Sequence, residues 1–284
     1  GNTKNDSYIH YMFKVSHEVP LCLLEDSIEF CDYDYALFHL LDKDKDYVDF
    51  FMKAKQQGRY IILDNSLHEL GEAYHDSGLL HWVNELKPNE FIVPDVWQDT
   101  NASIVNARKW AQIKLPKGVT KVAVVQAQNF LDAILCYQTY KDLGYKKIAF
   151  SYGAEYYLDH SNHPNKNIAK SLGRVQVISR MYSMDMITKN DRVHLLGCQV
   201  PQEFSLYKDM PFIETIDTSN PIMATLDGIQ YGRNIRQMGS LHHPKQSFSL
   251  WRQIPFSPIC CRSQFQRKHL HSYLLVAKVR WQGW

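Results

Sequence analysis

Short β-rich runs alternate with longer amphipathic stretches along most of this chain, and that alternation limits the possible folds more than any other feature. Seven runs have the length and residue types of strands: 36–41, 60–63, 91–93, 122–125, 148–151, 193–196 and 212–216. Helical spacing of apolar residues occurs between them, over 47–57, 77–86, 102–113, 130–143 and 168–182. Such alternation is typical of a parallel sheet covered by helices.

We predict an α/β fold, a TIM-type (β/α)8 barrel with a basic C-terminal extension. Seven strands in about 220 residues, with an eighth possible at 273–279, fit a barrel better than the alternative, an open doubly wound sheet. Neither a GxGxxG nor a GxxxxGK[ST] turn is present to support the nucleotide-binding form of that sheet. We divide the chain into a lead-in segment over 1–35, a catalytic barrel over 36–227 and a basic segment over 228–284 that completes the barrel.

Charge is distributed unevenly along the chain. The formal net charge is +2, yet no Asp or Glu follows Asp227, and residues 228–284 hold nine Lys and Arg. Aromatic residues such as Trp251 and Tyr273 interleave with these charges, which suits nucleic acid; a solvated basic surface is the alternative. The residues expected to contact nucleic acid are Arg233, Arg236, Lys245, Arg252, Arg262, Arg267 and Lys268.

Cysteine usage and hydropathy bear on where the protein works. The six cysteines are scattered and none forms a CxxC pair, so we expect reduced thiols in the cytoplasm. No run of 18 apolar residues is present, so we expect no membrane span.

Polar residues and glycines follow six of the expected strands. Barrel enzymes place their chemistry at these C-terminal strand ends. A single Asp after a strand is commonly a helix N-cap, but three that converge with a glutamine favour a functional site. The residues expected at this mouth are Asp64, Asp95, Gln126, Tyr152, Gly153, Gly197 and Asp217.

Paired carboxylates without a metal suit the cleavage of glycosidic bonds. One carboxylate attacks the anomeric carbon, and the other manages protons at the leaving group. Amide side chains and glycine backbone groups can read the edge of a planar base. A divalent metal site is the alternative, but His68 and His194 form neither an HxH nor an HExxH pattern. We therefore expect neither a metal nor a cofactor.

Six short motifs occur in the same order as these strand ends. They are LDNSLHELG (63–71), PD (94–95), VVQ (124–126), SYGAE (151–155), HLLGCQVPQE (194–203) and FIETIDTSNP (212–221). Together they resemble the motifs of the tRNA-guanine transglycosylases and of their phage relatives that put 7-deazaguanines into DNA. The resemblance covers residues 36–221, with Ala127 where the family's VQG motif has glycine.

The resemblance implies a role for each residue at the mouth. Asp217 would be the nucleophile that attacks C1′ of a guanine nucleotide and forms a covalent glycosyl intermediate. Asp64 would be the general acid for the departing guanine and the general base for the incoming 7-deazaguanine. Asp95 and Gln126 would hydrogen-bond the Watson–Crick edge of the base. Close approach of the flat ring is the role expected of Gly153 and Gly197, and stacking that of Tyr152.

Two departures from the family affect the choice of substrate. The tRNA enzymes carry a CxCxxC…H zinc site, for which Cys260 and Cys261 with nearby histidines are a poor substitute. The chain is also markedly shorter, and its C-terminal segment is basic. These differences favour a compact phage-type enzyme that acts on DNA in a host cytoplasm. The alternatives are a queuine-type tRNA enzyme, a base-excising glycosylase and an inactive nucleic-acid-binding barrel.

Overall fold

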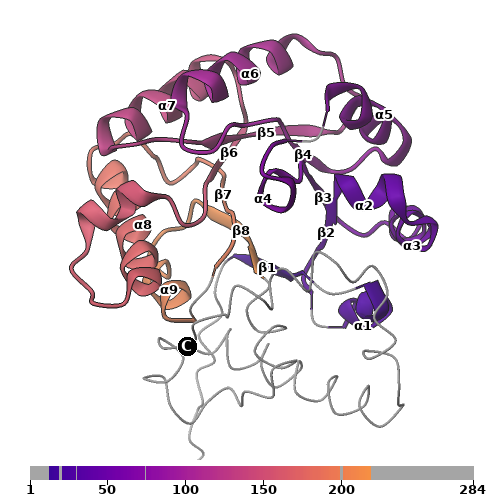
Figure 1. Cartoon of the computed structure of the whole chain (residues 1–284), viewed down its shortest axis with the longest axis horizontal. Helices are drawn as coiled ribbons and strands as arrows, with labels where there is room; N and C mark the ends of the chain where they lie inside the picture. The colour runs from indigo at the N-terminus through magenta and orange to yellow at the C-terminus, as the bar shows by residue number, and fades with distance from the viewer. Residues whose placement is uncertain (1–12, 19–20, 30, 74, 199–200, 219–284) are drawn as a thin grey trace, which may run out of the picture.

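The computed structural model describes residues 13–18, 21–29, 31–73, 75–198 and 201–218 (Figure 1). The expected basic segment, with its seven candidate nucleic-acid contacts, lies outside these residues, as does the expected strand at 273–279. In the part of the chain that is described, no helix is both long and apolar enough to cross a bilayer.

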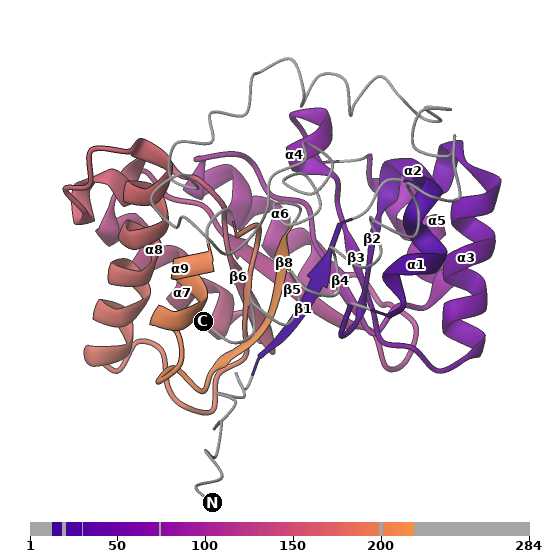
Figure 2. The same ribbon diagram turned by 90° about the horizontal axis from the view of Figure 1, so that it is seen from below.

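Eight parallel strands form one sheet that curves into a nearly closed barrel, which confirms the predicted α/β fold (Figures 1 and 2). They are β1 (Lys14–His17), β2 (Asp34–Leu37), β3 (Ile61–Asp64), β4 (Glu90–Ile92), β5 (Thr120–Val125), β6 (Lys147–Phe150), β7 (Val193–Leu195) and β8 (Ile213–Thr218). The order in the sheet is β1-β8-β7-β6-β5-β4-β3-β2. Its two ends meet where Asp32 N–H donates to Val15 O at 2.9 Å and Ser16 Oγ donates to Tyr33 O at 2.7 Å.

The first strand comes from the segment that was expected to be a lead-in. β1 pairs in parallel with β8, Lys14 opposite Thr215 and His17 opposite Thr218. The expected start of the barrel at residue 36 was wrong, because β1 has only four residues and two of them are Lys and His. The expected strand at 36–41 also needs correction, since it runs from Asp34 to Leu37 and a helix begins at Phe38. A short apolar run in the sequence does not show whether the segment forms a strand or a helix.

Helices follow most strands and cover the outside of the barrel (Figure 1). The five predicted helices are α3 (Lys45–Gln56), α5 (Asp76–Leu86), α6 (Thr100–Gln112), α7 (Phe130–Asp142) and α8 (Lys166–Ser183). Side chains of Asp44, Asp99, Asn129 and Asn165 cap four of them by accepting backbone N–H groups. The short elements are α1 (Leu24–Ser27), α2 (Phe38–Lys43), α4 (Leu67–Leu70), α9 (Pro201–Leu206) and the 3-10 turns η1 (Leu21–Leu23) and η2 (Glu155–His160).

Strand alternation separates two buried apolar clusters. On β3, Ile61 and Leu63 face the helices and join the larger cluster, whereas Ile62 joins the smaller cluster inside the barrel. The inner cluster also includes Tyr35 of β2 and Val124 of β5. It fills the middle of the barrel, so polar groups that face inward lie at one of its two ends.

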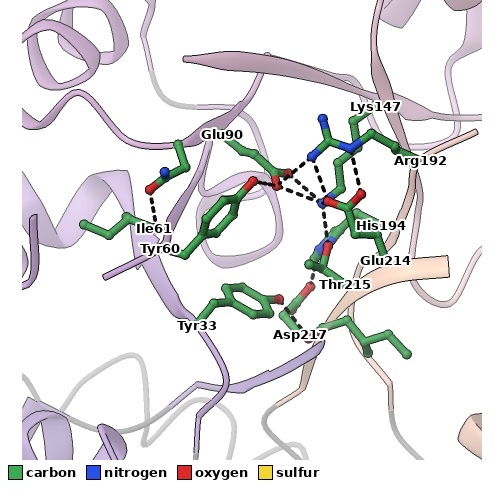
Figure 3. Close-up of polar contacts among 12 residues, drawn as sticks. Tyr33, Tyr60, Ile61, Glu90, Lys147, Arg192, His194, Glu214, Thr215 and Asp217 are labelled. Carbon is green, nitrogen blue, oxygen red and sulfur yellow. Dashed lines mark hydrogen bonds and ion pairs between the residues drawn. The ribbon is translucent and has the colours of Figure 1, made fainter. Parts of the chain in front are cut away.

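An ion cluster, which we call the basal cluster, lies at the N-terminal ends of the strands (Figure 3). It consists of Lys147 and Glu90, which are buried, and of Glu214 and Arg192, which are partly exposed. The Lys147 side chain is 0% exposed, and its Nζ lies 2.8 Å from Glu90 and 3.1 Å from Glu214. Arg192 forms a two-point pair with Glu214 at 2.6 and 2.7 Å. Each buried charge thus has a partner of opposite sign.

Candidate functional site

Asp217 lies inside the barrel on β8 and is only 4% exposed. Its Oδ1 lies 2.9 Å from His194 Nε2 (Figure 3). The same oxygen accepts the Gly197 N–H at 3.2 Å. Gly197 has a φ of +61°, and an added Cβ would lie 3.0 Å from the Tyr152 ring, so glycine suits this position. The structure therefore brings together three of the expected mouth residues, with Asp217 inside its strand rather than after it.

Asp64, the last residue of β3, is the second buried carboxyl group of the mouth. Burial raises its pKa well above the ordinary value, and the charges of Glu69 and Asp217 raise it further. The Ser66 N–H donates to its Oδ2 at 3.0 Å and offsets this only in part. Burial and these neighbouring charges thus favour the protonated form of Asp64, next to a second carboxyl group.

Glu18 also belongs to this group of carboxyls, and sequence reasoning missed it. It directly follows β1, and its N–H donates to Thr218 O at 2.9 Å. Burial raises its pKa, as do the charges of Asp217, Glu69 and Asp64, and it shares a hydrogen bond with Asp217. No strand was predicted before it, so nothing in the sequence marked it as a strand-end residue.

We call these four residues the mouth carboxyl cluster: Glu18, Asp64, Glu69 and Asp217. Glu69 comes from α4, the short helix directly after β3, which lies over the C-terminal end of the barrel (Figures 1 and 2). Mutual repulsion and burial both favour protonation within such a cluster. One cluster can therefore hold a carboxylate and a carboxylic acid at the same pH.

Asp95 is held by two amide side chains beside this cluster. Its Oδ1 accepts from Asn65 Nδ2 at 2.8 Å, and its Oδ2 accepts from Gln126 Nε2 at 2.7 Å. Burial raises its pKa to about 6, although both hydrogen bonds act to lower it. Each carboxylate oxygen keeps lone-pair capacity for a ligand. Asp95 and Gln126 were both expected at this mouth, and the structure shows that they contact each other there. Asn65 is a further partner that sequence reasoning missed.

Gln126 is itself fixed in orientation. Its Oε1 accepts the Gln98 N–H at 2.9 Å, which identifies the nitrogen of the amide as the group that faces Asp95. Thr100 Oγ1 donates to the Gln126 backbone O at 2.7 Å. One Nε2 hydrogen remains beyond the bond to Asp95. The Asp95–Gln126 pair thus presents, in a fixed orientation, the acceptor oxygens of Asp95 and one donor N–H of Gln126.

Tyr152 and Gly153 follow β6 on the neighbouring side of the mouth. Gly153 has a φ of +67°, and the Tyr152 ring lies over Gly197 and edge-on to His68, with ring centroids 6.0 Å apart. Ser151 was not predicted as a site residue. Strand alternation places it on the inward face with Lys147, and its Oγ is buried with no hydrogen-bond partner in the described residues. Such a hydroxyl is available to a ligand.

A buried ion pair supports the loop that carries Gly197. Arg174 of α8 is paired with Glu203 of α9, Nε to Oε1 at 2.7 Å, and both side chains are 2% exposed or less. Arg174 Nη1 also donates to Leu196 O at 2.7 Å, and its Nη2 donates to Gly197 O. These hydrogen bonds hold the loop in place, and with it the Gly197 N–H that donates to Asp217. Glu203 lies in one of the quoted motifs, but Arg174 carried no recognisable pattern.

Within the described ranges, no group of three or more His, Cys, Asp or Glu side chains could hold a metal ion. His68 packs edge-on to Tyr152, and His194 lies between Thr215 and Asp217. Cys260 and Cys261 lie outside the described residues.

In comparisons with known proteins, the sequence matches no family model and no curated protein. The function must therefore be argued from the motifs and from the geometry of the mouth.

Proposed function

We propose that this protein is a transglycosylase that exchanges guanine in DNA for a 7-deazaguanine base through a covalent Asp217–glycosyl intermediate. One observation carries the proposal: Asp217 accepts a backbone N–H inside the same mouth in which burial and carboxyl neighbours raise the pKa of Asp64. Two such carboxyl groups in one mouth can supply the nucleophile and the acid that glycosidic exchange needs.

In the first half of the reaction, Asp217 attacks C1′ of the guanine nucleotide. The C1′–N9 bond breaks, a bond forms between C1′ and an Asp217 carboxylate oxygen, and the Asp64 proton passes to the departing guanine. In the second half, N9 of the incoming base attacks C1′ and gives its proton to Asp64. The Asp217 carboxylate leaves, so both residues return to their starting states.

The Asp95–Gln126 pair suits both bases of such an exchange. Ionised Asp95 can accept hydrogen bonds from the N1–H and the 2-amino group of guanine, with Asn65 and Gln126 holding it in place. A 7-deazaguanine presents the same edge and differs at position 7. A site that reads this edge therefore admits both the leaving and the incoming base. The buried Ser151 hydroxyl is available for a further contact.

DNA is the substrate that the acid-free basic segment over 228–284 favours. Positive charge on that segment would bind phosphates, so affinity should fall steeply with salt. A guanine in a duplex must also be flipped out of the stack to reach a mouth inside a barrel.

The test is release of labelled guanine from duplex DNA and, separately, from tRNA, each with and without a 7-deazaguanine base. The proposal expects release from DNA only when the base is present, and a protein–DNA adduct that survives denaturation. Asp217→Ala should lose both, whereas Asp49→Ala, at an exposed position on α3, should keep both. Release from tRNA alone would overturn the DNA assignment, and release without an acceptor base would indicate a hydrolytic glycosylase. Absence of release from either nucleic acid would contradict the proposal.

A further inference from the structure

A continuous chain of hydrogen bonds links the basal cluster to Asp217 inside the barrel (Figure 3). Lys147 Nζ lies 2.7 Å from Thr215 Oγ1, which lies 2.7 Å from His194 Nδ1. His194 Nε2 lies 2.9 Å from Asp217 Oδ1. All four residues are buried, and they come from β6, β7 and β8. The direction of each bond decides the protonation state of the histidine.

Lys147 sets the direction of the first two bonds. An ammonium group has only donors, so Thr215 Oγ1 accepts from Lys147. The other two Lys147 hydrogens face Glu90 and Glu214. The hydroxyl hydrogen of Thr215 is then free to be donated, and His194 Nδ1 is the acceptor at the same oxygen. Nδ1 therefore carries a lone pair.

A neutral imidazole with a lone pair on Nδ1 carries its proton on Nε2. That proton points at Asp217 Oδ1, which also accepts the Gly197 N–H. The opposite tautomer would turn a lone pair toward Oδ1. It would also leave the Thr215 hydroxyl hydrogen without an acceptor in the described part of the chain.

We infer that His194 is a positioning residue for Asp217, and that Lys147 fixes the His194 proton on Nε2 through Thr215. This inference rests on the proposed function in so far as Asp217 is the nucleophile there. The ring of Tyr35 lies parallel to that of His194, with 6.0 Å between centroids and 12° between planes, and maintains its orientation. A neutral His194 ring thus donates a hydrogen bond to Asp217 Oδ1 and orients the carboxyl group for attack on C1′.

The tautomer is tested directly by nitrogen NMR on the full chain with ¹⁵N-labelled histidine rings. The His194 signals are identified as those absent from the spectrum of His194→Gln. We expect a protonated Nε2 and an unprotonated Nδ1. Thr215→Val should shift the Nδ1 signal to that of a nitrogen without a hydrogen bond, and Thr215→Ser should restore it. A proton on Nδ1, or on both nitrogens, would overturn the inference, as would a Thr215→Val spectrum equal to the wild type.

The positioning role is tested by the rate at which the Asp217–DNA adduct forms in a single turnover. A glutamine amide can donate where Nε2 donates and accept where Nδ1 accepts, so His194→Gln should stay within about threefold of the wild type. His194→Leu should be slower by about tenfold to a hundredfold, the loss expected for one hydrogen bond to a charged group. A folded His194→Gln variant as slow as His194→Leu would mean that His194 takes up a proton, which overturns the positioning role.

The two tests separate this inference from the proposed function. The NMR measurement needs neither substrate nor activity, so it reports on the Lys147–Thr215–His194 chain even where no base is exchanged. Normal base exchange with the wrong tautomer would overturn the inference alone. The expected tautomer in a protein that exchanges no base would overturn the proposed function alone.

Discussion

The two ends of the barrel interior bury charged groups in different ways. In the basal cluster, Lys147 and Arg192 are paired with Glu90 and Glu214. Burial opposes ionisation of Glu214, but Arg192 and Lys147 outweigh it and lower its pKa to about 2. At the mouth, the neighbours of Asp64 are other carboxyl groups, and its pKa is raised. Compensated charges hold a fold together, whereas carboxyls forced together at a strand-end mouth indicate chemistry.

After Asp217→Ala, the change at the mouth with the largest expected effect is Asp64→Asn. Guanine release should fall by about a hundredfold to ten-thousandfold, because the amide cannot supply the proton to the departing base. The free energy of unfolding should not fall, since the uncharged amide relieves the burial and carboxyl repulsion that raise the pKa of Asp64. Single-turnover guanine release and denaturant unfolding measure the two effects. If Glu18→Gln instead shows the larger loss of activity, the acid is Glu18.

Lys147→Met is the corresponding change at the base of the barrel, and it should act on stability. It leaves Glu90 buried without its ammonium partner, so we expect a loss of about 3–5 kcal/mol in the free energy of unfolding. Lys109→Met is the matched control, because Lys109 pairs with Asp76 at the surface, where the two side chains are 49% and 50% exposed, and it should cost about 1 kcal/mol or less. Equal losses in the two variants, measured by urea unfolding, would remove the distinction between buried and surface pairs.

The pH dependence of stability at Asp95 provides a further comparison of the mouth with the basal cluster. Its pKa is about 6 in the folded protein against an ordinary value of 3.8, so the folded state binds the proton more tightly. This contribution to stability is complete below pH 4 and is lost as the pH rises through 6, by about 3 kcal/mol for a shift of this size. The free energy of unfolding of Asp95→Asn relative to the wild type should therefore rise by that amount between pH 4 and pH 7. A difference that does not change with pH would contradict the raised pKa.

The same titration affects recognition of the base. In the proposed reaction, ionised Asp95 accepts the guanine N–H groups, so base binding by the wild type should weaken as the pH falls below about 6. The basal Glu214 behaves in the opposite sense: its lowered pKa adds stability above its ordinary value of 4.5, and that stability is lost as the pH falls toward 2. The mouth and the base thus respond to acid with opposite signs.

The sequence predicted the parts of the molecule that depend on local patterns. Apolar runs with turn residues between them located seven strands, and the polar residues after them located Asp64, Asp95 and Gln126 at one mouth. β1 and Glu18 were missed, because a four-residue strand with Lys and His at its ends has no clear periodicity. Lys147 was left outside the predicted strand at 148–151, although it begins β6.

The partners of Lys147 show why the basal cluster could not be predicted from the sequence. Glu90 and Glu214 lie 57 and 67 residues away in the sequence, and only closure of the barrel brings them to one ammonium group. The same holds for His194, which was weighed as a metal ligand. Thr215 and Asp217 became its partners only through the pairing of β7 with β8.

Two glycines with left-handed backbone conformation, one at each end of the barrel, form a closely matched pair of sites. Their replacement by alanine should give the smallest effects on stability and activity. Gly58 precedes β3 on the basal side, with a φ of +73° and open space around it; Gly197 is at the mouth, with a φ of +61° and the Tyr152 ring at 3.0 Å from an added Cβ. Alanine at either position should cost about 1 kcal/mol of backbone strain in thermal or urea unfolding. Only Gly197→Ala should also slow base exchange, because the backbone must shift away from Tyr152 and carries with it the N–H that reaches Asp217. Equal exchange rates for the two variants would show that this N–H does not contribute to the reaction, and would leave His194 as the donor on which Asp217 depends.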